Sequence, residues 1–332
     1  AVQPPLVLGL EATTRDRDSL AEEFRACTPW VEELPAHLSP VERSGTVVAL
    51  ARAHGVGVVL LADPSPECLA VRAALRRHVP QIRAVRRVGG TGLPPYGERA
   101  EGDADILVLP RAPSPGGPRA GVERDRVRVI GFGIDGAPFD PAGIGEARRL
   151  RARQRSGVPP GAALVVFLGR MIARKRPHDV LALACRFRPE AARFRMVGEG
   201  PLALAIDREI ERCSLSQVRR VAADPDVPAL LAASDALVLP SEREGLPRVL
   251  LEAQAAGKPV VAATASGLVE DTLALTGGGV VVGRVADIDG LEQGLRRVLA
   301  EPPEPEAVRR AVGEHFDVKR MAAAYGELLW PR

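Results

Sequence analysis

The stretch Ala162-Ala163-Leu164-Val165-Val166-Phe167-Leu168-Gly169-Arg170 joins an uninterrupted apolar run to a glycine and a cation. An apolar run of this length predicts a strand that is buried on both faces, as strands of parallel sheets are. A similar arrangement returns twice further on. Arg193–Val197 runs into Gly198-Glu199-Gly200-Pro201, and Ala236–Leu239 runs into Pro240-Ser241. The repetition predicts parallel strands whose carboxyl ends carry glycine and polar residues.

Helical segments separate these strands and continue the alternation in both directions. In the second half the expected helices are Pro177–Cys185, Leu202–Cys213, Pro228–Ala233, Pro247–Ala256 and Ile288–Ala300, and the further strands are Pro259–Ala263 and Gly279–Val282. In the first half the expected strands are Leu6–Leu10, Val56–Ala62, Ile82–Val85, Asp105–Leu109 and Val127–Ile130, with helices Pro40–His54 and Glu67–His78. Alternating strands and helices predict an α/β protein with two Rossmann-like, doubly wound domains.

Composition limits the class of protein. The 332 residues are 46% hydrophobic and 26% charged, which suits two folded domains and excludes a disordered chain. A net charge of +3 gives no electrostatic support for nucleic-acid binding, so no nucleic-acid partner is expected. No apolar run is long enough for a transmembrane segment, and the sequence opens without a secretory signal.

Two residue types carry further information. The four cysteines form no C-x-x-C pair, which indicates reduced thiols in a cytoplasmic protein, with peripheral placement at the inner membrane face as the alternative. Only three of the 45 basic residues are lysines, at Lys175, Lys258 and Lys319. Arginine, alanine and proline prevail, as expected from codon bias in a GC-rich bacterium. In such a chain a retained lysine can indicate a required shape, although we expect Lys258 and Lys319 on the surface.

Three segments that follow strands form the candidate ligand site. They are Gly169-Arg170-x4-Lys175, Gly198-Glu199-Gly200-Pro201, and Ser241–Arg248, which leads into a helix containing Glu252. In open parallel sheets, ligands bind at the carboxyl ends of the strands. Two cations, a glycine turn and a helix N-terminus suit a phosphorylated ligand, because free N–H groups and the helix dipole favour anions. The guanidinium can bind two phosphate oxygens at once, whereas the lysine amine acts as a compact point charge.

Each of these features also has an ordinary structural explanation. Cations near a strand end are often solvated surface residues, and Arg174 and Arg176 fit that description. Gly198-Glu199-Gly200 alone fits a plain tight turn. Helical spacing alone places Glu252 among solvated or capping residues. Only the combination of the segments points to a ligand site.

Further motifs occur in a fixed order around these segments. They are Val129-Ile130-Gly131-Phe132-Gly133-Ile134-Asp135-x3-Phe139-x-Pro141, Ser234-Asp235-x4-Pro240-Ser241, and Glu244-x7-Glu252 followed by Ala253-x2-Ala256-Gly257-x-Pro259-Val260-Val261. Near the end comes Glu314-His315-Phe316. Together with Gly169-Arg170-x4-Lys175, this series resembles the retaining glycosyltransferases of family 4, which have the two-domain GT-B fold with a central cleft between the domains.

The resemblance implies a role for each charged residue of the site. Arg170 and Lys175 would hold the diphosphate of a nucleoside-diphosphate sugar and stabilise charge on the leaving group. Glu244 would lie beside the transferred sugar and contact its hydroxyls. Glu252 would accept hydrogen bonds from the ribose. No enzyme nucleophile is assigned.

The resemblance also implies that backbone groups bind the donor. N–H groups at Gly245 and Leu246 would face the sugar and phosphate. The backbone near Val221–Ala223 would meet the base. The glycines at the strand ends would line the nucleotide site; they are Gly169, Gly198 and Gly200.

The resemblance divides the chain into two domains. Residues 1–134 would be an acceptor-side domain, shortened and completed by the C-terminal helix 317–332, and residues 135–316 would bind the donor. Independently, the clustering of glycine and proline predicts a linker near Gly131–Gly145. The first half departs from the family pattern. Glu11-Ala12-Thr13-Thr14 stands where a glycine-rich turn is usual, and Arg86 with Arg87 stands where a histidine is usual.

These observations predict transfer of a sugar from a nucleoside-diphosphate sugar to an acceptor hydroxyl with retention of anomeric configuration. The acceptor, whether glycan, lipid, protein or small molecule, is not identified. No metal or other cofactor is expected, because we find no Asp-x-Asp at a strand end. Asp16-Arg17-Asp18 and Asp103-Ala104-Asp105 have that spacing, but the first lies in a polar segment and the second precedes a strand, so both should be solvated.

Three alternatives stay open at this point. The first is a nucleotide-sugar-binding module with a degenerate acceptor domain. The second is another GT-B enzyme, such as a sugar-nucleotide epimerase or a glycogen-phosphorylase-like enzyme; the latter needs a pyridoxal-phosphate lysine, and neither Lys175 nor Lys258 lies in a recognisable cofactor site. The third, an NAD-dependent dehydrogenase, is disfavoured because no G-x-G-x-x-G follows the first strand of either half.

Overall fold

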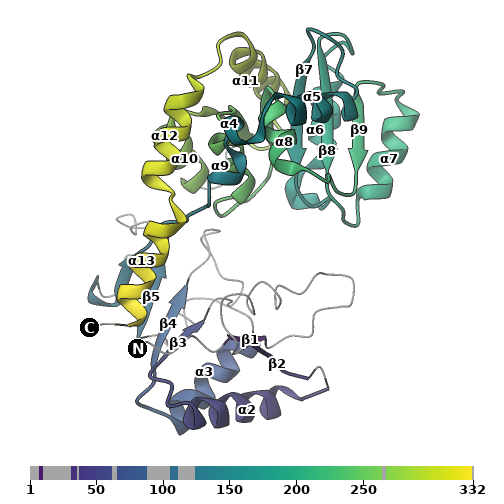
Figure 1. Ribbon diagram of the computed structural model, residues 1–332. Coiled ribbons are helices and arrows are strands. Elements are labelled where there is room, and N and C mark those ends of the chain that lie inside the picture. Colours follow the sequence, from purple (N-terminus) through teal and green to yellow (C-terminus); the bar gives the residue numbers. More distant parts are fainter. Residues whose placement is uncertain are drawn as a thin grey trace. The chain divides into compact units, whose positions relative to one another are not determined.

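The computed structural model describes residues 7–9, 31–35, 37–61, 66–87, 105–110, 124–263 and 267–330. The chain divides into two compact units, with the main boundary between Val129 and Ile130 (Figure 1). Both units contain parallel sheets and helices, which confirms the predicted α/β class. Glu11-Ala12-Thr13-Thr14 and Asp16-Arg17-Asp18 lie outside the described residues.

The first unit contains a small pair of strands and a larger parallel sheet. Strand β1 (Val7–Gly9) pairs with β2 (Val31–Glu33). The larger sheet runs in the order β3-β4-β5-β6 and consists of Val58–Leu61, Arg83–Arg87, Ile106–Leu109 and Val127–Val129. Helix α2 (Pro40–Ala53) begins with a capping box, in which the Ser39 hydroxyl accepts from the Glu42 N–H and the Glu42 carboxylate accepts from the Ser39 N–H. Helix α2 and helix α3 (Pro66–His78) share an apolar core that includes Val47, Val71 and Leu75.

One sequence-based expectation for the first unit is wrong. Strand β4 continues through Arg87, so Arg86 lies within the strand and is buried, whereas we expected both arginines beyond its end. The strand extends this far because Arg86 and Arg87 pair with Leu107 and Val108 of β5. Asp105 is exposed, as expected. Its carboxylate also accepts from the Ala84 N–H at 2.6 Å and pairs with Arg72 at 3.4 Å.

The second unit is built on a six-stranded sheet in which all strands are parallel. Its order is β12-β11-β10-β7-β8-β9. In chain order the strands are β7 (Ala163–Leu168), β8 (Ala192–Val197), β9 (Val218–Val221), β10 (Ala236–Leu239), β11 (Val260–Ala263) and β12 (Gly279–Val282). The chain moves outward from β7 to β9, then returns to the other side of β7 and moves outward again. This reversal is the mark of a doubly wound sheet.

Helices cover both faces of this sheet, and each face has its own apolar core. One core involves α5 (Glu146–Arg155), α8 (Val227–Ala233), α9 (Arg248–Ala255), α10 (Gly267–Thr276) and α12 (Pro305–His315). The other involves α6 (Pro177–Ala184), α7 (Ala203–Arg212) and α11 (Ile288–Ala300). Along β7, Leu164 and Val166 belong to the first core, and Val165 and Phe167 to the second. The strand is therefore apolar without interruption because both of its faces are buried.

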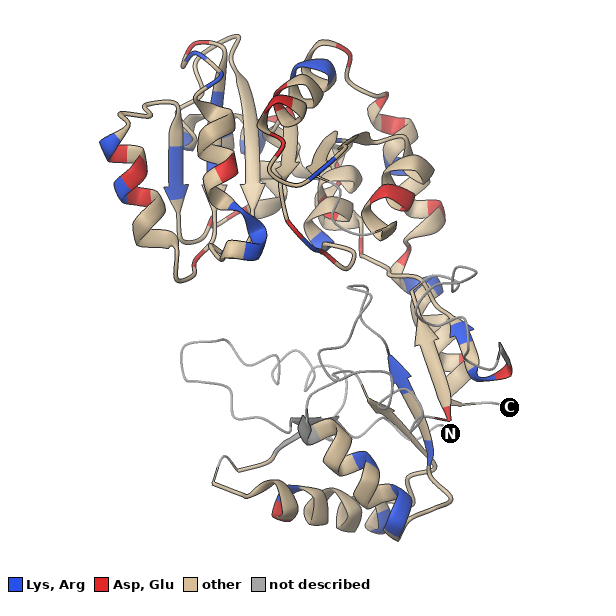
Figure 2. Ribbon diagram, turned by 180° about the vertical axis from the view of Figure 1, so that it is seen from behind, with Lys and Arg blue, Asp and Glu red and all other residues tan. Residues whose placement is uncertain are grey.

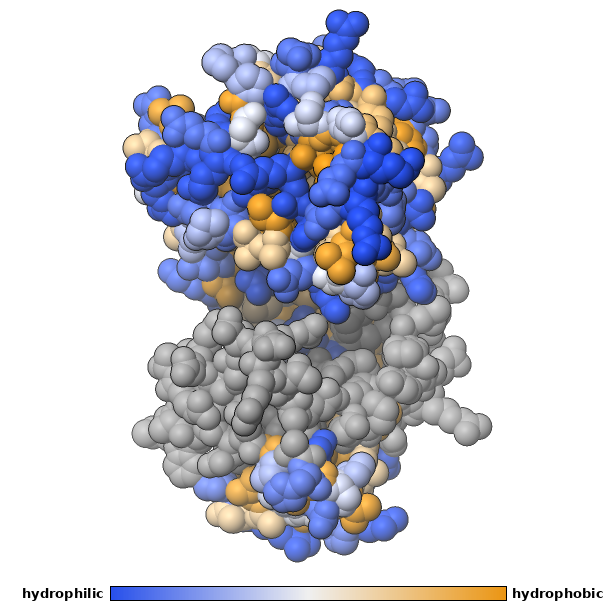
Figure 3. All heavy atoms as spheres, turned by 90° about the vertical axis from the view of Figure 1, so that its right-hand side faces the viewer, coloured by the Kyte–Doolittle hydropathy of each residue, from blue (hydrophilic) through white to orange (hydrophobic). Residues whose placement is uncertain are grey.

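The surface of the second unit and the edge strand of its sheet are more polar than its two apolar cores. Strands β7, β10 and β11 carry no charged residue and are tan in Figure 2, whereas the edge strand β9 carries Arg219 and Arg220. The face of the second unit seen in Figure 3 is mostly hydrophilic with scattered apolar residues. Isolated apolar residues of this kind are usual on soluble surfaces. Among the described residues, no helix has the length and apolarity needed to cross a membrane.

The segment expected to be a linker contains short helices instead. They are η3 (Ala137–Phe139) and α4 (Pro141–Ile144). Just before them, the Ile134 N–H donates to the Phe316 carbonyl at 2.8 Å, and the Val318 N–H donates to the Ile134 carbonyl at 3.1 Å. These bonds attach the start of the last helix, α13 (Val318–Leu329), to the beginning of the second unit, to which that helix belongs. Its completion of an acceptor-side domain stays a prediction.

Candidate functional site

Strand β7 stands at the point where the strand order of the second unit reverses. Its neighbours are β8 on one side and β10 on the other. The chain segments after β7 and β10 therefore leave the sheet in different directions, and the crevice outside the carboxyl ends at such a point is where doubly wound proteins bind ligands. The segments concerned are 169–176 and 241–247.

These two segments are joined by three polar contacts. The Glu242 N–H donates to the Arg174 carbonyl at 2.8 Å. The Arg174 guanidinium donates to the Arg243 carbonyl at 3.0 Å, so this arginine is not simply solvated as expected. The Lys175 amine binds the Glu244 carboxylate, and only 16% and 6% of these two side chains are exposed. The structure thus places a cation and a carboxylate, which are 69 residues apart in sequence, in direct contact.

The backbone at Arg176 determines where Lys175 lies. Lys175 ends a short 3-10 helix, and Arg176 then adopts a left-handed conformation with φ +52° before α6 begins. This conformation is uncommon for a residue with a side chain. It is accompanied by two hydrogen bonds from the Arg176 guanidinium to the Asp179 carboxylate, at 2.6 and 2.9 Å. Arg176 is therefore an anchored residue and not the solvated one that the sequence suggested.

The glycines at the end of β8 allow a close approach to the segment after β7. Gly198 and Gly200 have φ values of +143° and +148°. A Cβ at Gly198 would lie 2.0 Å from the Gly169 carbonyl oxygen, and one at Gly200 would lie 2.6 Å from the Met171 carbonyl oxygen. In addition, the Met171 N–H donates to the Glu199 carbonyl at 2.7 Å. The Gly-x-Gly sequence is thus explained by backbone packing between two strand ends.

The end of β9 adjoins the same region. The Gly198 N–H donates to the Val221 carbonyl at 2.9 Å. The Arg220 guanidinium donates to the Gly198 carbonyl at 3.0 Å and also binds both oxygens of Asp207 in α7, which raises the pKa of Arg220. Val221 therefore lies beside the glycine turn, as the sequence-based site requires.

Glu244 and Glu252 have different surroundings. Glu244 is buried and paired, whereas Glu252 lies in the second turn of α9 with 16% of its side chain exposed. Burial raises the pKa of Glu252, and Arg248, whose guanidinium lies 3.6 Å away, opposes the rise. The expectation from helical spacing, that Glu252 is solvated or capping, is wrong. Gly245 and Leu246, between the two carboxylates, are partly buried.

Arg170 differs from Lys175, Glu244 and Glu252 in its surroundings. Its side chain is exposed, and within the described residues that side chain makes no hydrogen bond or ion pair. A guanidinium in this position can bind an anion without first breaking an existing contact. Arg170 is therefore available to a ligand, whereas Lys175 is already balanced by a carboxylate.

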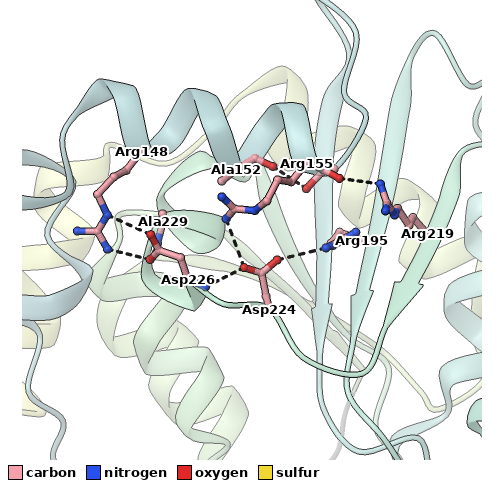
Figure 4. Close-up of polar contacts among 9 residues, drawn as sticks. Arg148, Ala152, Arg155, Arg195, Arg219, Asp224, Asp226 and Ala229 are labelled. Atoms are coloured by element: carbon pink, nitrogen blue, oxygen red, sulfur yellow. Dashed lines mark hydrogen bonds and ion pairs between the residues drawn. The ribbon is translucent and has the colours of Figure 1, made fainter.

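The sequence holds two further Asp-x-Asp motifs. Asp287-Ile288-Asp289 lies after β12, and the Asp287 side chain caps α11. The statement that no such motif stands at a strand end is wrong for Asp224-Pro225-Asp226, which follows β9. Its two carboxylates bind arginines: Asp224 pairs with Arg155 at 3.4 Å and with Arg195 at 3.3 Å, and Asp226 pairs with Arg148 at 2.8 Å (Figure 4). The signal that could have found this cluster is the seven-residue spacing of Arg148 and Arg155, which places both on one helix face.

Residues 148–314 match the family model described as Glycosyl transferases group 1. The chain belongs to this family. The matched span runs from α5 to α12 and contains every residue of the candidate site.

Curated relatives of this glycosyl transferase family member carry a more specific name. A D-inositol 3-phosphate glycosyltransferase of Salinispora arenicola is 35% identical over 190 residues, which are 52% of this chain and 42% of the relative. A protein of the same name from Actinosynnema mirum is 35% identical over 228 residues, 61% of this chain and 52% of the relative. The chain thus spans about half the length of these relatives.

Solved structures confirm the GT-B fold of this family member. A glycosyltransferase from Rickettsia africae has a TM-score of 0.80 and 18% sequence identity, with 99% of this chain and 91% of that chain covered. An Anabaena protein, Alr3699/HepE in complex with UDP-glucose, has a TM-score of 0.76 and 19% identity, with 94% and 89% covered. At these identities the likeness concerns the fold.

Proposed function

We propose that this glycosyl transferase family member moves a sugar from a nucleoside-diphosphate sugar to an acceptor hydroxyl, with retention of anomeric configuration. The observation that carries the proposal is the contact of Lys175 with Glu244, with the exposed Arg170 on the same segment as Lys175, beside the switch point of a doubly wound sheet. Cations there suit a diphosphate, and an adjacent carboxylate suits sugar hydroxyls. Neither role needs a metal ion, so we propose a metal-independent reaction.

Leaving-group stabilisation would be the main chemical contribution. Negative charge grows on the diphosphate as the glycosidic bond breaks, and fixed cations favour that change most in the transition state. Arg170 is available for this task because its side chain makes no hydrogen bond or ion pair within the described residues. Lys175 would share its amine between the diphosphate and Glu244. N–H groups at Gly245 and Leu246 would complete the phosphate and sugar contacts.

The nucleoside would be bound on the side of the diphosphate that faces away from the transferred sugar. Glu252 is a partly buried carboxylate, and within the described residues its one polar contact is with the Arg248 guanidinium at 3.6 Å, so ribose hydroxyls would supply further hydrogen bonds. Gly169 and the Gly198-Glu199-Gly200 turn would let a ligand approach the backbone closely. Backbone groups near Val221 would meet the base. The whole arrangement is one donor site on the second unit.

The comparisons supply the first ligands to test. The Anabaena neighbour is named as a complex with UDP-glucose, so UDP and its sugars come first. The curated relatives are named for D-inositol 3-phosphate, which makes a phosphorylated polyol one acceptor to try among glycans, lipids, proteins and small molecules. We propose a bacterial, cytoplasmic enzyme, or one held peripherally at the inner membrane face.

Thermal unfolding with GDP, UDP, ADP and TDP tests the donor site. A nucleotide present at about a hundred times its Kd should add about 2.7 kcal/mol of stability. For a unit of this size that corresponds to a rise in Tm of roughly 5–11 °C. Arg170→Ala is the matched control, since it removes an exposed side chain and should leave the ligand-free Tm unchanged while weakening the shift.

Two results would contradict the proposal. If none of the four nucleotides changes the Tm, the second unit does not hold a nucleoside-diphosphate site. If a nucleotide sugar binds but is neither transferred nor hydrolysed, the protein is a binding module instead of an enzyme.

A further inference from the structure

A polar cluster with a buried centre links helix α5 to the segment between β9 and α8. Arg148 and Arg155 lie seven residues apart on α5 and so share one face of the helix. Each binds one carboxylate of Asp224-Pro225-Asp226, as Figure 4 shows. The Arg219 guanidinium of β9 also donates to the Arg155 carbonyl at 3.0 Å, so helix and strand are tied to each other as well as to the segment.

Asp224 is the centre of this cluster. Its side chain is 1% exposed and receives three contacts: from Arg155 at 3.4 Å, from Arg195 at 3.3 Å and from the Asp226 N–H at 3.0 Å. Arg195 comes from β8, is 5% exposed and has a pKa lowered by burial. A buried carboxylate between two guanidiniums cannot shift without leaving a charge unpaired. The backbone at Asp224 is therefore fixed.

Asp226 fixes the far end of the segment. Its carboxylate binds two nitrogens of Arg148 at 2.8 and 3.0 Å and accepts from the Ala229 N–H at 3.1 Å, which caps α8. The hydrogen bond from Arg148 lowers the pKa of Asp226. At the near end, the Val221 carbonyl accepts from the Gly198 N–H. Only Ala222 and Ala223 lie between these anchors, and both are exposed at the carboxyl edge of the sheet.

Stability alone does not account for this cluster. Within the described part of the chain, the Nε and Nη1 atoms of Arg195 are buried without a hydrogen-bond partner. Such groups cost free energy, and apolar side chains of similar volume would cover β8 without that cost. The cluster is therefore a costly way to stabilise the fold. It does, however, keep the backbone at Ala222 and Ala223, which precede Asp224, in a fixed position.

We infer that Asp224, held by Arg155 and Arg195, is a positioning residue for the nucleobase. It fixes the backbone of 221–223, so that peptide groups meet the base without first becoming ordered. The inference rests on the proposed function, because it needs a nucleoside diphosphate in the donor site. A ligand gains affinity when the groups that receive it are already in place.

The test compares a nucleoside diphosphate with inorganic pyrophosphate, which has no base. Calorimetry gives Kd for both, using whichever of GDP, UDP, ADP and TDP binds the wild-type chain most tightly. Asp224→Asn keeps the shape of the side chain but removes its charge. It should weaken nucleotide binding by about tenfold, since the segment must then be ordered on binding, and leave pyrophosphate binding unchanged. A merely structural role would not change the ratio of the nucleotide Kd to the pyrophosphate Kd.

A matched control exists at the other end of the sheet. Asp235 also binds an arginine, Arg153 at 3.0 Å, and the Leu164 N–H at 2.6 Å, just before β10 begins. Asp235→Asn should lower the Tm without changing the ratio. Arg155→Ala provides a milder variant should Asp224→Asn fail to fold, because Arg195 still holds Asp224; it should change the ratio in the same direction.

The outcomes separate this inference from the proposed function. If the wild-type chain binds a nucleotide and the variants keep the wild-type ratio of nucleotide Kd to pyrophosphate Kd, the positioning role is overturned and the proposed function stands. If both ligands weaken equally in Asp224→Asn and Arg155→Ala, the cluster supports the whole site and the inference is again overturned. If the wild-type chain binds none of the four nucleotides, the proposed function fails and the inference fails with it.

Discussion

Substituting alanine for Gly198 should disrupt the candidate site from within the backbone. The new Cβ would lie 2.0 Å from the Gly169 carbonyl oxygen, whereas ordinary van der Waals contact begins at 3.4 Å, so the two segments must separate by about 1.4 Å. In addition, the φ of +143° is one that residues with side chains rarely adopt. Both effects act where β8 and β7 end.

The two effects can be given magnitudes. Backbone strain of this kind costs about 1–3 kcal/mol, and forced overpacking costs about 1–3 kcal/mol more. Together, about 2–6 kcal/mol should lower the Tm of a unit of roughly 200 residues by about 4–24 °C. The displaced segment carries Arg170 and Lys175, and an error of about 1 Å in the position of such groups can cost about a hundredfold in rate. Gly198→Ala should therefore lose both stability and transfer activity.

Thermal unfolding and steady-state kinetics of Gly198→Ala and of a control variant test this prediction. Gly283→Ala is the control, because Gly283 has no positive φ and a Cβ there would meet nothing within 4 Å. If Gly198→Ala melts within about 1 °C of Gly283→Ala, the close approach of Gly198 to Gly169 does not determine the arrangement of the strand ends, and the reasoning fails.

Four further results are expected. Arg170→Ala and Lys175→Ala should each lower kcat by about 10²–10³-fold in steady-state kinetics, and near-wild-type rates in both would end the leaving-group assignment. Glu252→Gln should raise the KM for the donor more than it lowers kcat, whereas Glu244→Gln should chiefly lower kcat; the opposite split would exchange their roles. Because burial raises the pKa of Glu252, ionising it costs stability in the folded state, so Glu252→Gln should raise the Tm at pH 7. That gain should vanish below about pH 4.3, where the carboxyl is protonated in both states, and a gain independent of pH would refute the cause. Burial lowers the pKa of Lys258, so Lys258→Met should raise the Tm at pH 7. This gain in Tm should shrink as the pH approaches about 10.4, where the lysine loses its charge in both states. If thermal melts show the same gain across that pH range, better packing is its cause.

Local patterns predicted much of the fold because they reflect local physical causes. The apolar runs at Ala236–Leu239 and Gly279–Val282 form strands with the expected bounds, and Ile288–Ala300 forms a helix with the expected bounds. Each of these segments has a buried face that its own sequence displays. The predicted α/β class and the doubly wound sheet of the second unit followed from their alternation.

Elements held by distant charges could not be predicted in the same way. Helix α5 has few apolar residues and strand β9 has two arginines among its four residues, so neither displays a buried face. Their partners, such as Asp226 for Arg148, are 78 residues away. The pairing of Lys175 with Glu244 was hidden for the same reason, although both residues had been selected for the site. Lys258, expected on the surface, is partly buried among charges from two helices, α5 and α12, and from Asp235 just before β10.

The scarcity of lysine makes the candidate site chemically addressable. Acylating reagents react with amines and spare arginine, and the chain offers them only three side-chain amines. Lys319 is exposed, Lys258 is partly enclosed, and Lys175 is engaged by Glu244. A limiting dose of such a reagent should therefore mark Lys319 first. The extent of modification at Lys175, read by mass spectrometry with and without nucleotide, would then report occupancy of the site from a single peptide.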